Sequence, residues 1–272
     1  MKKNKELAYI FLVLVFFTGA VSFLGDPIKS FITFLGLPSF NATLNSSIIL
    51  RTFILLLLII GIFRLGFQTF NGFESWYHAK HFQAWFGLLL FCGLIFSTNY
   101  TLFIETDSVT LVLFIFSNIL IGLTEEFIFR GTILPLFIMY FKNKKYVLAI
   151  SILFSSLLFG IGHYSNIFSQ SMSFEIATNQ VFMASIFGLI LGVIILRTKN
   201  LIFVSILHGV LNIGLSSGRL RVENSQATDD IIQEGMGWAN IGINVFLIIL
   251  LIFIGLYLIK KVNKREILNT LE

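Results

Sequence analysis

Long apolar stretches recur along the whole chain and are separated by short polar breaks. A helix of about 20 apolar residues is long enough to cross the hydrocarbon core of a bilayer. The pattern therefore predicts an all-α, polytopic membrane protein with about eight transmembrane helices. The expected spans are 7–24, 46–63, 85–103, 108–141, 147–163, 177–196, 201–215 and 239–260.

The segment 108–141 is too long for one straight crossing. Its 34 residues would extend about 51 Å as a helix, against a hydrocarbon core of about 30 Å. Pro135 lacks a backbone donor and Gly131 lies one turn earlier, so a kink near these residues is one solution. A short interfacial helix ahead of Thr124 is the other.

Composition agrees with a membrane protein. The 272 residues are 56% hydrophobic and 12% charged, with three prolines, which leaves no room for a soluble domain. Residues 66–83 mix aromatic with polar side chains, as an interfacial amphipathic segment does, and residues 216–238 are the one long polar loop. The single cysteine, Cys92, can form no intrachain disulfide and is expected to pack in an apolar run.

The net charge of +5 comes from short clusters at the predicted helix ends, so it indicates topology and not a nucleic-acid surface. Eight crossings would place both termini on one side, and the first helix is too long for a signal peptide. Fourteen basic residues fall on the side of the termini and four on the other. Both termini are therefore expected to be cytoplasmic. The four are Lys29, Arg51, Arg219 and Arg221.

Two acidic residues, Glu125 and Glu126, lie within a predicted span, where an ionisable group is costly and points to function. Arg130 follows Glu126 by four residues on the same helix face, which favours an ion pair. Glu125 is then left as the candidate general base. Alternatively, both glutamates and Arg130 form one polar network that only fixes helix packing.

Two of the four histidines also lie in or at the end of apolar segments, and each has a partner one turn away. Phe159 precedes His163 in FGIGH, and His208 precedes Asn212 in HGVLN. Neutral donors of His208 and Asn212, aimed at one point, suit an oxyanion hole. A polar clamp between helices is the competing interpretation.

Depth within the membrane tests this grouping. From the predicted cytoplasmic ends, Glu125 and His163 both lie about 24 Å along their helices. His208 lies only about 10 Å along its helix. The difference requires a tilted helix, a connection that starts deeper, or different helix ends.

Together, EEFIFR (125–130), FGIGH (159–163) and HGVLN (208–212) resemble the E-E-x-x-x-R, F-x-x-x-H and H-x-x-x-[N/D] motifs of one family. That family comprises the CAAX protease and bacteriocin-processing (CPBP, or Abi) intramembrane endopeptidases. The resemblance divides the chain into N-terminal helices with the interfacial segment (1–105), a catalytic core (106–215), and an extracytoplasmic loop with the last helix (216–272).

The resemblance implies a protease in which Glu125 and His163 activate a water, while His208 and Asn212 stabilise the oxyanion. Glu126 and Arg130 would organise the site. We expect no cofactor, because H-E-x-x-H is absent and Asn212 suits oxyanion binding better than metal ligation. Zinc held by Glu125, His163 and His208 is the alternative.

The expected partners are the bilayer and a membrane-associated peptide or protein substrate. The family resemblance includes bacteriocin or signal-peptide processing, bacteriocin immunity and CAAX-type processing, among which the sequence does not choose. A non-proteolytic scaffold or immunity protein of the same fold is the alternative function. A proton-coupled transporter is disfavoured by the absence of an internal repeat.

Overall fold

The computed structural model describes residues 4–73, 100–169, 173–220 and 257–271, together with Gly93, Phe96, Ile249, Phe253 and Gly255. These residues form helices and turns, with no strand among them. The helical elements are α1 (Asn4–Phe34), α2 (Ser39–Leu65), α4 (Ser108–Ile128), η2 (Phe129–Ile133), α5 (Leu134–Tyr140), α6 (Val147–Gly162), η3 (His163–Ser165), α7 (Asn166–Ser169), α8 (Phe174–Thr198), α9 (Leu201–Leu215) and α12 (Lys264–Asn269).

Five helical runs in the described part are long and apolar enough to cross a membrane, which confirms the multi-pass class. They are Lys5–Phe34, Ser39–Leu65, Ser108–Tyr140, Val147–Ser165 and Phe174–Thr198, and α9 is a shorter apolar helix. The expected spans 85–103 and 239–260 lie mostly outside the described residues, as do Cys92 and most of the polar loop 216–238. The number eight therefore stays a prediction.

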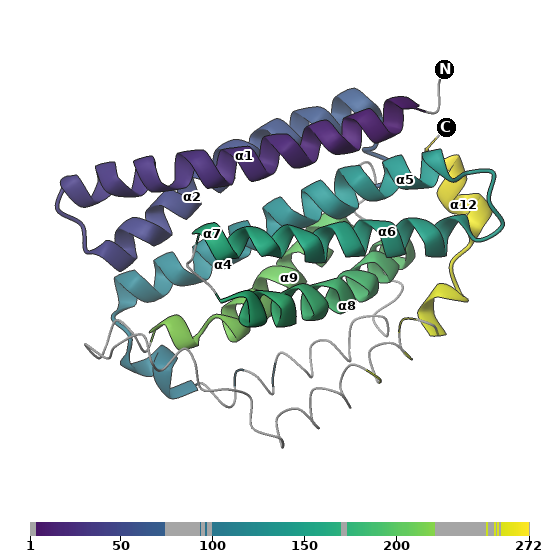
Figure 1. The fold of residues 1–272 in the computed structure, drawn as a ribbon. Helices are drawn as coiled ribbons and strands as arrows, with labels where there is room; N and C mark the ends of the chain where they lie inside the picture. Colours follow the sequence, from purple (N-terminus) through teal and green to yellow (C-terminus); the bar gives the residue numbers. More distant parts are fainter. Residues whose placement is uncertain are drawn as a thin grey trace.

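Helix α4 lies at the centre of the bundle (Figure 1). It packs against α2 on one side and α9 on the other, while α6 pairs with α8, and α1 covers α2 and α5. The side chains of α4, η2 and α5 become almost wholly buried from Glu126 onward. By contrast, α1 exposes many large apolar side chains, such as Phe23 and Phe31, as a lipid-facing helix does.

The long run 108–141 bends through a single π-helical turn, Phe129–Ile133, at the place where Gly131 and Pro135 predicted a kink. The Leu134 amide donates to the Phe129 carbonyl, five residues back. Pro135 cannot donate to the Gly131 carbonyl, which instead accepts from Asn71 Nδ2 at 3.0 Å. Such turns widen a helix and often occur at functional sites.

The connection between α8 and α9 leads into the bundle, so that α9 begins deeper than the end of α5. The Leu201 amide donates to the Asn71 carbonyl at 3.2 Å. A methyl group placed on Gly131 would lie 2.9 Å from the Leu201 side chain. Thus α9 begins at the level of the π-helical turn, well away from the end of α5 at Tyr140.

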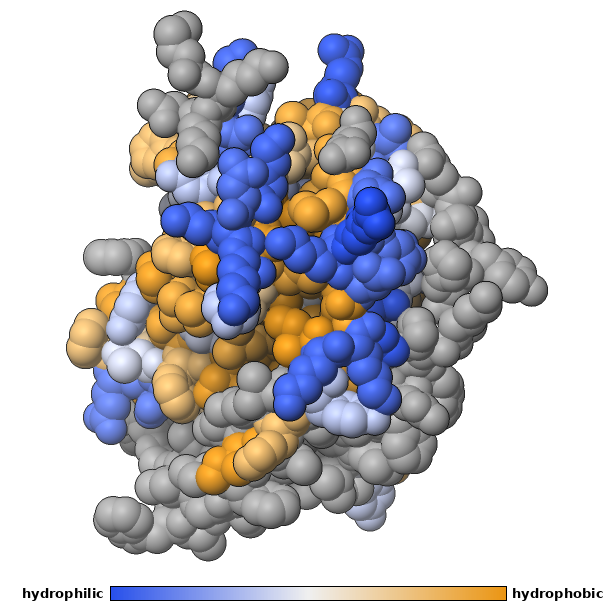
Figure 2. Space-filling model, turned by 90° about the vertical axis from the view of Figure 1, so that its right-hand side faces the viewer, coloured by the Kyte–Doolittle hydropathy of each residue, from blue (hydrophilic) through white to orange (hydrophobic). Residues whose placement is uncertain are grey.

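The start of α1, α5 and α12 lie at one end of the bundle (Figure 1). Lys199 pairs with Glu266 of α12, and Arg197 donates to the Lys261 carbonyl at 2.6 Å. Figure 2 faces this end and shows hydrophilic residues around an apolar interior. The start of α1 and the α12 segment therefore lie at the same end of the bundle, and the cytoplasmic placement of both termini stays a prediction.

Candidate active site

Glu126 forms the buried centre of the polar cluster. Its Oε1 lies 3.0 Å from Arg130 Nη1, so the ion pair expected from the four-residue spacing is present. The same oxygen lies 2.8 Å from Nδ1 of His208. Glu126 is fully buried and Arg130 is 1% exposed. Because solvent does not reach the pair, each charge needs the other to offset the free-energy cost of its burial.

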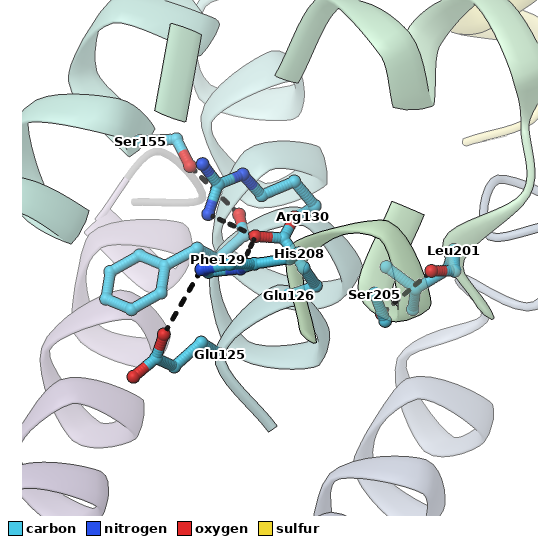
Figure 3. Close-up of polar contacts among 8 residues, drawn as sticks. All are labelled: Glu125, Glu126, Phe129, Arg130, Ser155, Leu201, Ser205 and His208. Atoms are coloured by element: carbon cyan, nitrogen blue, oxygen red, sulfur yellow. Dashed lines mark hydrogen bonds and ion pairs between the residues drawn. The ribbon is translucent and has the colours of Figure 1, made fainter. Parts of the chain in front are cut away.

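His208 stands between the two glutamates (Figure 3). Its Nε2 faces Oε2 of Glu125 at 3.7 Å. A carboxylate paired with Arg130 can only accept a hydrogen bond, so we assign the Nδ1 proton as the donor to Glu126. Nε2 is then an acceptor when the ring is neutral and a donor when the ring is an imidazolium.

The Phe159 ring connects the second motif to this cluster. Arg130 lies over it, with Cζ 4.6 Å from the ring centroid. The rings of His163 and His208 meet it edge to face, with centroid distances of 5.0 and 5.6 Å. One aromatic side chain thus positions Arg130 and both histidines, and it limits water access to the ion pair.

His163 ends α6 and opens the 3₁₀ turn η3. It is half-buried and interacts electrostatically with Glu125, Arg130 and His208. No direct hydrogen bond joins it to Glu125 among the described side chains. A water bridging the two would restore the geometry of a general base pair.

Asn212 lies one turn after His208 on α9. Its Nδ2 is buried and has no hydrogen-bond partner in the part of the chain that the structure describes. A buried amide donor without an acceptor is costly, so this atom is suited to an oxygen supplied by a ligand. The structure thus brings His208 to Glu125, and Asn212 shares the α9 face that carries His208.

Glycines bring α4 and α9 close enough for these contacts. A methyl group on Gly122 would overlap the Gly209 amide nitrogen and would lie 2.7 Å from the Ser205 carbonyl. One on Gly209 would lie 2.8 Å from Ile119 Cα. Small residues of this kind allow close backbone approach between membrane helices. Gly209 also directly follows His208, so the contact fixes the height of that histidine.

The inset start of α9 removes the depth mismatch. His208 lies seven residues, about 10 Å, beyond Leu201, and Glu126 lies five residues, about 8 Å, from Gly131. Since Leu201 and Gly131 are in contact, the two side chains meet. Among the three explanations left open, the deeper connection is the one that the structure adopts.

Arg51 is a neighbour of the site that the sequence analysis assigned only to topology. It lies within α2, more than three turns from the start at Ser39, and interacts electrostatically with Glu125. Its position inside an apolar helix was the signal that could have identified it. Ser155, which donates to the Phe129 carbonyl at 2.9 Å and supports the π-helical turn, carried no such signal.

A zinc site would require Glu125, His163 and His208 as ligands. In the described part of the chain, no three His, Cys, Asp or Glu side chains come close enough together to hold a metal ion. Glu125, His163 and His208 therefore form no three-ligand cluster in this structure, and no step below passes through a metal.

Residues 106–214 match the family model described as Rce1-like, type II CAAX prenyl endopeptidase Rce1-like. Searches against curated proteins and against solved structures gave no significant match. The matched residues contain all three motifs and both helices that carry the glutamates, His208 and Asn212. With the apolar helices, the match supports a membrane endopeptidase. The resemblance indicated by the three motifs is confirmed: residues 106–214 match the model of the Rce1-like CAAX protease family.

Proposed function

We propose that this protein is an intramembrane endopeptidase that hydrolyses a peptide bond of a membrane-associated peptide or protein. The observation that carries the proposal is the line Glu126–His208–Glu125, with contacts of 2.8 and 3.7 Å, inside an apolar bundle. A packing network needs its charges paired, as Glu126 and Arg130 are. It does not need a second carboxylate facing the free nitrogen of a histidine.

In the proposed reaction, Glu125 and His163 take a proton from a water whose oxygen attacks the scissile carbonyl carbon. The C=O π bond opens to a tetrahedral oxyanion. The proton is then returned to the leaving amine, the C–N bond breaks, and a carboxylic acid and an amine result. A general base of this kind contributes about 10²–10⁴-fold to the rate.

His208 and Asn212 would stabilise the oxyanion. Because Nδ1 donates to Glu126, Nε2 can donate to an oxyanion only when His208 is an imidazolium. The Glu126 carboxylate accepts from Nδ1 and so orients the ring, as an acidic partner does for histidines in other hydrolases. Glu126 and Arg130 therefore have a supporting role, and the buried Nδ2 of Asn212 supplies the second donor.

Glu125→Gln is expected to reduce peptide cleavage by about 10²–10⁴-fold while leaving membrane abundance unchanged, because the amide keeps the shape but is not a base. His163→Ala and His208→Ala should also lose activity. The exposed Glu105→Gln is the matched control and should behave as wild type. The same Glu125→Gln protein, purified with peptides that remain bound, would identify the substrate.

Wild-type processing by folded Glu125→Gln protein would contradict the proposal. It would favour the alternative, a non-proteolytic scaffold or immunity protein that keeps the polar cluster for packing.

Metal chelation is expected to leave cleavage by the purified protein unchanged, because the donors of the cluster are engaged with each other. The measurement is cleavage before and after treatment with a zinc chelator, together with the metal content of the protein. Stoichiometric zinc whose removal abolishes cleavage would show that Glu125, His163 and His208 rearrange around an ion.

We further propose that both termini are cytoplasmic and that the biological role is bacteriocin or signal-peptide processing, bacteriocin immunity, or CAAX-type processing. The sequence motifs support the class but do not choose among these roles.

A further inference from the structure

Arg51 is an arginine in the middle of an apolar membrane helix, outside the segment that matches the family. Its neighbours Leu50 and Ile54 are 5% and 0% exposed and belong to the main apolar core. Arg51 itself is half-buried. Placing a guanidinium at this depth is costly unless an anion or another polar partner compensates for it.

Among the described residues, no hydrogen bond to Arg51 compensates for the burial of its guanidinium. Nη1 of Arg51 is buried and lacks a hydrogen-bond partner among the described residues. Helix α2 packs directly on α4, and the anion with which Arg51 interacts is Glu125. Thr110 of α4 donates to Asn41 of α2 at 3.0 Å, and a methyl group on Gly131 would lie 3.0 Å from Ile62 of α2. Arg51 and Glu125 lie between these two contacts, one on each helix, and no direct bond joins them among the described residues.

The charges of the cluster indicate why Glu125 needs a second cation. Arg130 lies 3.0 Å from Glu126, on an oxygen that also contacts His208. Within the described part of the chain, Glu125 has the 3.7 Å contact to His208 Nε2, together with longer-range interactions with Arg130, His163 and Arg51. Glu126 is thus matched by Arg130, and among the arginines of the described residues Arg51 is a second one that interacts with Glu125.

We propose that Arg51 of α2 is a positioning residue that holds the Glu125 carboxylate at the reacting centre through the Arg51–Glu125 charge interaction. The proposal rests on the proposed function for its kinetic consequence. It extends the working site beyond residues 106–214 to the N-terminal helices, so α2 supplies part of the electrostatics and does not only support α4.

The kinetic test compares Arg51→Met, Arg51→Lys and the control Arg64→Met in the full-length protein in liposomes, with the peptide captured by Glu125→Gln. Arg64 is an exposed arginine in the last turn of the same helix. Arg51→Met is expected to lower kcat by about 10²-fold, the usual effect of a misplaced reacting group. Arg51→Lys should recover part of that loss, because it restores the charge, and Arg64→Met should have no effect.

Unchanged kcat for folded Arg51→Met would overturn the proposal. A change in KM alone would also overturn it and would assign Arg51 to substrate binding. Equal loss in Arg51→Met and Arg51→Lys would show that shape and not charge matters, which contradicts the electrostatic role.

A second measurement does not require activity. Unfolding of Arg51→Met, Glu125→Gln and the double variant forms a thermodynamic cycle. The proposal expects non-additivity of about tenfold in the unfolding equilibrium constant, because each single variant leaves one membrane-embedded charge without its partner. An additive cycle would overturn it. If Glu125→Gln remains active, the proposed function fails while this cycle still decides the Arg51–Glu125 interaction.

Discussion

Arg130→Met is expected to destabilise the folded protein by about 3–5 kcal/mol, the usual effect of removing one partner of a buried ion pair. Glu126 would remain fully buried with a charge that no neighbouring arginine balances. The stacking of the guanidinium on Phe159 would also be lost. Arg130→Lys should recover little, because an ammonium has neither the planar stacking surface nor the same reach. The measurement is the unfolding midpoint of the purified protein in detergent.

The charge-free double variant Glu126→Gln/Arg130→Met is the control for Arg130→Met. It should be more stable than Arg130→Met alone, because no uncompensated carboxylate is left in the core. However, it should still lack activity, since a glutamine does not hold the Nδ1 side of the His208 ring as the carboxylate does. If Arg130→Met had the same unfolding midpoint as the wild-type protein, the ion pair would not stabilise the bundle.

Gly122→Ala is expected to separate α4 from α9 and to reduce cleavage by about 10²-fold. The atoms nearest to the added methyl group are backbone atoms of Gly209 and Ser205, which cannot turn aside as a side chain can. The helices must therefore move apart by about 1 Å, at a cost of about 1–3 kcal/mol. His208, next to Gly209, would then lose its 2.8 Å contact with Glu126.

Gly61→Ala on α2 is the matched control for Gly122→Ala. A methyl group there meets nothing within 4 Å, and alanine favours a helix over glycine. Gly61→Ala should keep activity and slightly raise the unfolding midpoint. Full activity of Gly122→Ala would show that the close approach of α4 and α9 is not needed for the site.

The motifs could be identified without a structure because each lies within a single helical turn or two. Residues four apart share a helix face whatever surrounds them, so the Glu126–Arg130 pair was predictable. The bend near Gly131 and Pro135 was predictable for the same reason, since a missing donor acts locally. The form of the bend, one π-helical turn with Asn71 on the Gly131 carbonyl, was not, because Asn71 is 60 residues away.

The partners of His208 could not be predicted from spacing. The sequence analysis grouped it with Asn212 as a neutral donor and left Glu126 with Arg130. In the structure, Nδ1 meets Glu126 and Nε2 meets Glu125. Which nitrogen meets which carboxylate depends on how α9 rotates and how closely it approaches α4. The glycine contact sets that approach.

By itself, the sequence determined the membrane-helical class, the order of the three motifs and the local ion pair, because hydropathy and helical periodicity act over neighbouring residues. Only the tertiary structure decided the depth of His208 and the electrostatic interaction of Arg51 with Glu125. Counting from helix ends assumes that every helix starts at the same membrane surface. Here α9 starts inside the bundle, at Gly131, and Arg51 lies deep in α2. Such offsets are set by contacts between helices, which no single helix encodes.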